Sequence, residues 1–343
     1  MKKLLTFVSA ITAGAIGTAA AEVSVSGSGT FYYSSASGDL AVAANEDSMS
    51  VVGGSVNFAM STETTNGITV TGSASLTQDT DDVILTDTDA AGTVGGMSQL
   101  VFGMDGMTIT LGDIDNAGSG TGEGGDVATF ASTHASVHAA ATAVAAASDS
   151  AMDGIADGTG INISTSMGDA AIDLTFVSKV GSGSNSHSTN ATTTDYSSGY
   201  AINVGFDMAG ASVNVAAGGS QAKATADKNN TGMAIEASYP VSDALTVTVG
   251  GSNGTILGAD EDNLFITAAY TMDADTTLSI GLAEGDSTSS AGSLDKATST
   301  TINLSRSLGG GVSVFAEYAD INFNDAGVDS SASAVSVGTS VTF

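Results

Sequence analysis

The side chains of this sequence that could do chemistry are overwhelmingly carboxylates. There are 37 Asp and Glu against 7 Lys and Arg, a formal net charge of -30, together with three His and no Cys. The lack of Cys excludes a disulfide scaffold, a thiolate zinc site and a cysteine nucleophile. Because the negative charge would repel phosphates, no nucleic-acid partner is expected, and the composition favours interactions with cations.

Six acids lie in or beside one long segment, residues 114–158, that lacks strand periodicity. They are Asp113, Asp115, Glu123, Asp126, Asp153 and Asp157. A connection of about 45 residues is too long to be idle in a compact domain. Its Ala-rich part, from Ser132 to Ala147, has an N-cap candidate at Ser132 or Thr133 and therefore predicts a short helix. A disordered external loop is the alternative.

Further acidic clusters fall in other predicted connections. They are Asp79, Asp81 and Asp82, then Asp87 and Asp89, then Asp260, Glu261 and Asp262. Hard divalent cations prefer oxygen ligands, but no Asp-x-Asp-x-Asp-Gly loop with a closing Glu is present. We interpret these clusters as a solvated acidic rim, with loosely bound Ca²⁺ or Mg²⁺ at the external loops as the alternative. No other cofactor is expected.

Metal-dependent and nucleophilic catalysis have little support. His134 and His138 are four residues apart and would share a helix face, but His187 belongs to a different segment, so a third ligand is not obvious and no metal site is predicted. Ser and Asp are abundant, yet the sequence has no Gly-x-Ser-x-Gly elbow for a catalytic triad. We therefore do not expect an enzyme.

The elements that would position the carboxylates begin after a targeting segment. Lys2 and Lys3, the apolar run from Leu4 to Ile16 and the small residues up to Ala21 predict a signal peptide over residues 1–21, with an uncleaved anchor as the alternative. The whole chain is 42% apolar with a mean hydropathy of +0.21, which argues against intrinsic disorder. No later stretch reaches the roughly 18 uninterrupted apolar residues of a transmembrane helix.

Residues 22–343 instead alternate apolar with small or polar side chains at a period of two. We count sixteen such segments, joined by connections that are alternately long, such as 254–261 and 324–331, and tight, such as Asp105-Gly106. Short periplasmic turns and long external loops are typical of outer-membrane barrels, whereas a soluble sandwich need not segregate its connections by length. The residues of two segments that we expect to face lipid are Leu278, Ile280, Leu282, Val335, Val337 and Val341.

The prediction is therefore an all-β fold, a sixteen-stranded antiparallel transmembrane β-barrel with the long segment after strand 5. In the order and spacing of its features the chain resembles a Gram-negative general diffusion porin of the alphaproteobacterial type. The resemblance is carried by Glu22-Val23 with Ser26-Gly27, by the block from Phe102 to Asp113 before the longest segment, and by the final strand ending at Phe343.

This resemblance implies a location in the outer membrane, contact with its lipid, a homotrimer, and passive diffusion of ions and small hydrophilic solutes. It implies that residues 114–158 fold inward as a constriction loop. It also implies that Phe343 is the assembly signal read by the barrel-assembly machinery. Phe343 would at the same time be one more lipid-facing aromatic at the membrane interface.

The sequence departs from the resemblance in the charge of the pore wall. General porins usually oppose constriction acids with Arg and Lys, but the early-strand wall positions here are neutral, namely Ser55, Asn57, Thr69, Thr71, Ser73 and Ser75. The basic residues after the signal segment fall at strand ends, in loops or beside a turn, and are Lys179, Lys223, Lys228, Lys296 and Arg306. We therefore expect the six acids to form an acidic, cation-preferring constriction.

Two other functions stay open from the sequence. One is a secreted acidic Ca²⁺-dependent surface or adhesive β protein, which would explain the acidity and the lack of Cys equally well but not the alternation of long and short connections. The other is an outer-membrane barrel enzyme, which no motif encourages.

Overall fold

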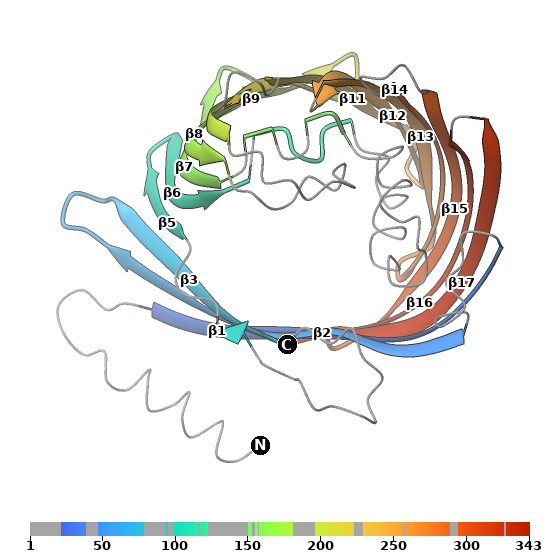
Figure 1. Ribbon diagram of the computed structural model, residues 1–343. Coiled ribbons are helices and arrows are strands. Elements are labelled where there is room, and N and C mark those ends of the chain that lie inside the picture. The colour runs from blue at the N-terminus through green and yellow to red at the C-terminus, as the bar shows by residue number, and fades with distance from the viewer. Residues whose placement is uncertain are drawn as a thin grey trace.

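The computed structural model describes most of the chain after residue 21. The described ranges are 22–38, 47–78, 93–94, 99–115, 117–122, 150–152, 155–156, 158–180, 196–222, 229–256, 258–288, 294–325 and 327–343. Their strands form one antiparallel sheet that closes on itself into a ring, with β15 to β17 across from β5 to β8 (Figure 1). Within these ranges, no helix is long and apolar enough to cross a membrane.

The wall consists of sixteen strands and one short accessory strand. In chain order the strands are β1 (Glu22–Gly38), β2 (Asp47–Glu63), β3 (Thr69–Gln78), β4 (Thr93–Val94), β5 (Gln99–Met104), β6 (Met107–Ile114), β7 (Gly158–Met167), β8 (Ala170–Val180), β9 (Tyr196–Met208), β10 (Ala211–Ala222), β11 (Asn230–Ser242), β12 (Leu245–Ile256), β13 (Ala259–Asp273), β14 (Thr276–Thr288), β15 (Leu294–Gly309), β16 (Val312–Asp325) and β17 (Val328–Thr342).

The two-residue strand β4 pairs with β3, which also pairs directly with β5, so β4 adds no position to the ring. Strand β1 pairs with β2 on one side and with β17 on the other, and this last pairing closes the barrel. The predicted sixteen-stranded antiparallel barrel is confirmed.

Alternation along each strand separates an outward from an inward set of side chains. Leu282 and Val335 are 49% and 50% exposed, whereas the neighbouring Ala334 and Ser336 are 1% and 0% exposed. The outward set is continuous across strands, since Ile266 on β13 lies opposite Leu282 on β14. All six residues expected to face lipid fall on this outward, apolar face, which is the arrangement that a barrel in a bilayer requires.

Tight turns occur at the predicted connections on one rim. Gly106 and Gly168 have φ of +71° and +64°, values that glycine adopts without the steric cost of a Cβ. These turns join β5 to β6 and β7 to β8 with two residues each. Their backbone conformation suits the twist of an antiparallel hairpin, so the sequence pattern was sufficient to locate them.

The strands on the opposite rim extend further than the sequence pattern indicated. Residues 254–261 and 324–331, expected to be external loops, are mostly strand, because β12 continues to Ile256 and β16 continues to Asp325. Polar cross-strand pairs explain this extension: Asn253 Nδ2 donates to Asp262 Oδ1 at 2.5 Å, and the β16–β17 hairpin holds an equivalent Asn–Asp bond. Such polar strand ends show no hydrophobic alternation in the sequence.

The two faces of β14 should respond differently to the same substitution. Leu282→Arg places a charge in the lipid-facing band and should destabilise the barrel by about 2–4 kcal/mol if it lies near the bilayer midplane. Ser279→Arg, on the inward face of the same strand and opposite Asn303, should change stability by less than about 1 kcal/mol. Urea titration of the protein in lipid vesicles measures both, and equal losses would contradict the assigned facing.

Candidate functional site

After β6 the chain turns inward and enters the interior of the barrel. The described parts of this connection, residues 117–122, 150–152 and 155–156, lie inside the ring against its wall (Figure 1). Met152 and Ile155 are 0% exposed. They belong to one apolar cluster with wall residues from β6 and β8 to β12, and its members are Ile114, Ala117, Met152, Ile155, Ala156, Val177, Ala201, Ala216, Ala234 and Ile256. The predicted inward fold is confirmed for these described residues.

Small residues on the inner wall let the inserted backbone approach the sheet. A Cβ at Gly232 would lie 2.3 Å from the Ala151 carbonyl oxygen, and one at Gly254 would lie 2.8 Å from Ala151 Cβ. A Cβ at Gly218 would lie 3.1 Å from Met152 Cε. We call this patch of Gly218, Gly232 and Gly254 the loop seat. The sequence analysis missed it, although glycines at inward positions of adjacent strands were a usable signal.

Hydrogen bonds from the wall hold both flanks of the insertion. The Ala117 N–H donates to Thr175 Oγ1 on β8 at 2.8 Å, and Asn162 Nδ2 on β7 donates to the same oxygen at 3.0 Å. On the second flank, the Ala151 N–H donates to Ser252 Oγ on β12 at 2.7 Å. These backbone donors are buried, so their pairing avoids the cost of about 1–3 kcal/mol for an unsatisfied group.

Two further contacts attach the turn at Gly122. Asn263 Nδ2 on β13 donates to the Gly122 carbonyl at 3.1 Å. The Gly122 N–H donates to the Glu236 carboxylate on β11. Ser150 Oγ donates to the Thr121 carbonyl at 2.7 Å, so the two flanks also bond to each other. The two described flanks, at Gly122 and Ser150, therefore lie close together against the wall.

The inner wall carries a set of carboxylates on both sides of the ring. Glu236 follows the outward-facing Ile235, which is 54% exposed, and Glu317 precedes the outward-facing Tyr318. Asn303 Nδ2 donates to Glu317 Oε1 at 2.5 Å across β15 and β16. By the same register and alternation, acids at inward positions of β8, β9, β11, β13 and β16 are Asp173, Asp207, Glu236, Glu261 and Glu317.

The described basic side chains lie on the other face of the sheet. Lys296 and Arg306 alternate in phase with the outward-facing Ile302 on β15. Lys296 Nζ lies 3.1 Å from Asp286 Oδ1, and Arg306 Nη1 lies 3.2 Å from Asp273 Oδ2. The side chains of Lys179, Lys223 and Lys228 are outside the described part of the chain. The inner wall, as far as its side chains are described, thus has acids without opposing bases.

The six residues expected on the early-strand wall are neutral and share the inward face. Asn57 on β2 lies opposite Ser75 on β3, and both are at inward positions. Ser55 Oγ lies 2.9 Å from Ser28 Oγ and accepts a bond of 3.4 Å from Asn57 Nδ2. The remaining expected wall residues share this phase and are Thr69, Thr71 and Ser73. Hydroxyl and amide groups therefore line this side of the lumen.

The acids first assigned to the constriction occupy different places. Asp113 shares the phase of Leu111, which is 40% exposed, while the adjacent Ile114 is 3% exposed and points inward. Its assignment to the constriction is therefore corrected, because alternation on β6 sends its side chain outward. Asp115 follows the strand and is exposed. The other four acids of this assignment lie outside the described ranges and are Glu123, Asp126, Asp153 and Asp157. The histidines and the predicted helix from Ser132 to Ala147 lie outside them as well.

The acidic cluster of residues 260–262 does not converge on one point. These residues belong to β13, so Glu261 points inward while Asp260 and Asp262 point outward. Asp260 Oδ1 accepts a bond of 3.0 Å from Thr255 Oγ1. In the described part of the chain, no group of three or more His, Asp or Glu is placed to hold a metal ion.

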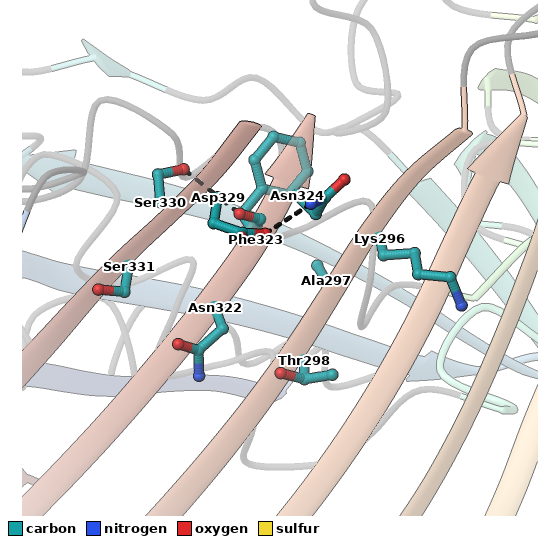
Figure 2. Close-up of a pocket in the computed structure, with 9 residues that line it drawn as sticks. All are labelled: Lys296, Ala297, Thr298, Asn322, Phe323, Asn324, Asp329, Ser330 and Ser331. Carbon is teal, nitrogen blue, oxygen red and sulfur yellow. Dashed lines mark hydrogen bonds between the residues drawn. The ribbon is translucent and has the colours of Figure 1, made fainter. Parts of the chain in front are cut away.

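A recess of about 460 Å³ lies at the ends of β15, β16 and β17 (Figure 2). Asn322 and Asn324 alternate in phase with the outward-facing Tyr318, and Thr298 with Ile302. Most of its lining side chains are therefore on the outer face of the barrel.

A closed antiparallel barrel with an apolar outer face, a polar and acidic interior and an inserted loop defines a channel protein of the porin architecture. The family model described as Gram-negative porin matches residues 6–326. The chain belongs to this family and is located in the outer membrane. A search of curated protein sequences finds no match.

Solved porins share this fold at low sequence identity. A mutant of the Rh. blastica porin is 17% identical over 94% of this chain and 100% of that chain, with a TM-score of 0.60. The anion-selective porin from Comamonas acidovorans is 12% identical over 94% of this chain and 100% of that chain, with a TM-score of 0.63. OmpT of Vibrio cholerae in its trimer form is 12% identical over 94% and 99%, with a TM-score of 0.60. At these identities the likeness shows the fold.

Enlarging the loop seat should displace the insertion. Gly232→Val would force atoms against the Ala151 carbonyl and Ile155 Cδ1, which a Cβ would already approach to 2.3 and 2.6 Å. We expect a stability loss of about 1–3 kcal/mol and an altered single-channel conductance, because the loop must shift or the wall must strain. The control is Gly103→Val, another inward glycine, whose Cβ would meet its nearest atom at 3.6 Å. Equal conductance in both variants would argue against the seat.

Proposed function

We propose that this outer-membrane porin is a passive diffusion channel for ions and small hydrophilic solutes, with a preference for cations. The observation that carries the proposal is the charge of the inner wall. Its described acids, Asp173, Asp207, Glu236, Glu261 and Glu317, are at inward positions, with Glu261 buried, whereas the described bases Lys296 and Arg306 face outward. A fixed negative potential in a confined lumen concentrates cations and excludes anions.

The fold alone does not decide the sign of the selectivity. The Comamonas acidovorans porin has the same fold and is described as anion-selective. A channel discriminates ions through the charged side chains that ring its narrow section, and these vary independently of the barrel. The proposal therefore depends on the acids of this chain and on no property of the relatives.

Residues 114–158 would form the constriction of this channel. The described flanks of this segment, residues 117–122, 150–152 and 155–156, lie against β8 to β13 inside the barrel. We propose that the loop narrows the pore and that its acids add to the negative potential of the wall. These acids are Asp115, Glu123, Asp126, Asp153 and Asp157. Asp113 is not among them, since its side chain is on the outer face.

Several further assignments belong to the same proposal. The trimer form of Vibrio cholerae OmpT supports a homotrimer for this chain. Residues 1–21 act as a signal peptide, outer-membrane lipid surrounds the apolar face, and Phe343 serves as the signal for the barrel-assembly machinery. Ca²⁺ or Mg²⁺ bound loosely at the acidic outer rim stays a prediction.

The outward apolar band and the family membership favour this channel over a secreted surface protein and over a barrel enzyme.

Neutralising the inward acids should weaken the preference for K⁺. In the triple variant Asp173→Asn, Glu236→Gln, Glu317→Gln, the reversal potential in a KCl gradient should move towards zero, because the lumen loses fixed negative charge. The difference from the parent should be larger at 0.1 M than at 1 M salt, since the Debye length falls from about 10 Å to about 3 Å.

The matched control removes three acids from the outer face through Asp262→Asn, Glu284→Gln and Asp320→Asn. It loses the same net charge but should keep the parent's reversal potential. A parent channel that prefers Cl⁻ would contradict the proposal outright. An unchanged preference in the inward triple variant would assign selectivity to other acids.

Shortening the insertion should widen the pore. Replacing residues 123–149 by a short Gly-Ser linker is feasible because Ser150 Oγ already bonds to the Thr121 carbonyl at 2.7 Å, so the two flanks need not move. Single-channel conductance should rise and cation preference should fall. Deletion of residues 184–192, in another long connection, serves as the control and should leave conductance unchanged. Unchanged conductance after the first deletion would count against a constriction loop.

A further inference from the structure

The two ends of the barrel wall meet at Gly27 and Phe343. The strands β1 and β17 are paired from Ser28 with Thr342 to Gly38 with Ala332. The pairing continues by one more residue: the Gly27 N–H donates to the Phe343 carbonyl at 2.9 Å, and the Phe343 N–H donates to the Gly27 carbonyl at 3.0 Å. The terminal residue of the chain is therefore a full partner in the sheet, placed directly opposite Gly27.

The Phe343 ring lies over Gly27. A Cβ built on Gly27 would be 2.4 Å from Phe343 Cζ and 2.8 Å from Cε1, distances that real Cβ atoms do not show. Gly27 is at an outward position, in phase with Val25, yet it is buried. Gly29, the next outward position on β1, would meet nothing within 4 Å if it carried a Cβ. The space for a side chain is thus occupied at Gly27 and free two residues later.

The last strand is also fastened on its other edge. The Thr342 N–H donates to the Gly311 carbonyl at 2.7 Å, and Thr342 Oγ1 donates to the same oxygen at 3.2 Å. Chain termini usually fray unless neighbouring elements tie them down. Here β16 holds the terminal strand on one side, and the pair of Gly27 and Phe343 holds it on the side where the ring of strands closes.

We propose that Gly27 is the seat of the terminal aromatic ring and that the Gly27–Phe343 pair is the latch that completes barrel closure and keeps it closed. An aromatic side chain laid over a cross-strand glycine fills the space that the glycine leaves and shields the two backbone hydrogen bonds from competing water. These bonds are the last rungs between the first and final strands. The latch concerns closure and is independent of the ion preference of the channel.

Refolding from urea into lipid vesicles tests the latch without any assembly partner. The variants are Gly27→Ala, Gly29→Ala, Phe343→Ala and the double variant Gly27→Ala/Phe343→Ala. We expect Gly27→Ala to unfold several-fold faster than the parent, as followed by loss of the compact band in unheated gels, and Gly29→Ala to match the parent.

The double variant separates the effect of contact with the Phe343 ring from the effect of contact with the backbone. Ser55 O would also lie 2.8 Å from a Cβ at Gly27, and this contact stays when the ring is removed. In the Phe343→Ala background the added effect of Gly27→Ala should therefore be smaller, though not zero. If Gly27→Ala behaves like Gly29→Ala, or if its effect is the same in both backgrounds, the latch is refuted.

A second measurement covers the case in which Gly27→Ala does not fold. Hydrogen exchange at the Gly27 amide, which is bonded to the Phe343 carbonyl, should become several-fold faster in Phe343→Ala. Phe31→Ala is the control, because Phe31 is another outward aromatic on β1, 49% exposed, and it lies opposite Thr339 on β17. Equal exchange at Gly27 in the two variants would show that the ring does not protect the seam, and would overturn the proposal.

Discussion

Every backbone N–H and C=O that enters a bilayer must find a partner within the protein, and the rest of this structure follows from that constraint. A sheet with free edges cannot meet it, so β1 must pair with β17 as well as with β2. Closure by an antiparallel sheet then forces strict alternation, with apolar side chains outward and the others inward. It also concentrates the problem of sheet edges at one seam, where the first and last strands meet.

Closure creates an interior that must be filled or left as a pore, and the described parts of the connection between β6 and β7 occupy some of it. The loop approaches the wall closely only because the seat on β10 to β12 is made of glycine, so backbone can meet backbone there. Thr175, Ser252 and Asn263 pair the polar groups of the loop that would otherwise be buried without partners. Packing and hydrogen bonding thus act on the same few strands.

The same geometry sorts the charges of the chain. Acids such as Glu236 and Glu317 are at inward positions, where Gly122 and Asn303 donate hydrogen bonds to them. Lys296 and Arg306 stay on the outer face, each beside an aspartate. Because neighbouring positions on a strand face opposite sides, a shift of a single residue decides whether an acid acts on the pore or on the surroundings of the barrel.

Period-two alternation and the tight turns determined the strand count, the barrel and the lipid-facing residues such as Leu282, because these are local properties of the sequence. Residues 254–261 were predicted to be a loop and not the end of a hairpin, because their polar cross-strand pairs leave no hydrophobic pattern. Only the tertiary structure decided that Asp113 faces outward and that Glu236 meets Gly122. These facts depend on the phase of each strand and on contacts between residues far apart in the chain, and a one-residue change in register reverses them. The pairing of Gly27 with Phe343 is of the same kind, since it exists only once the two ends of the sheet have met.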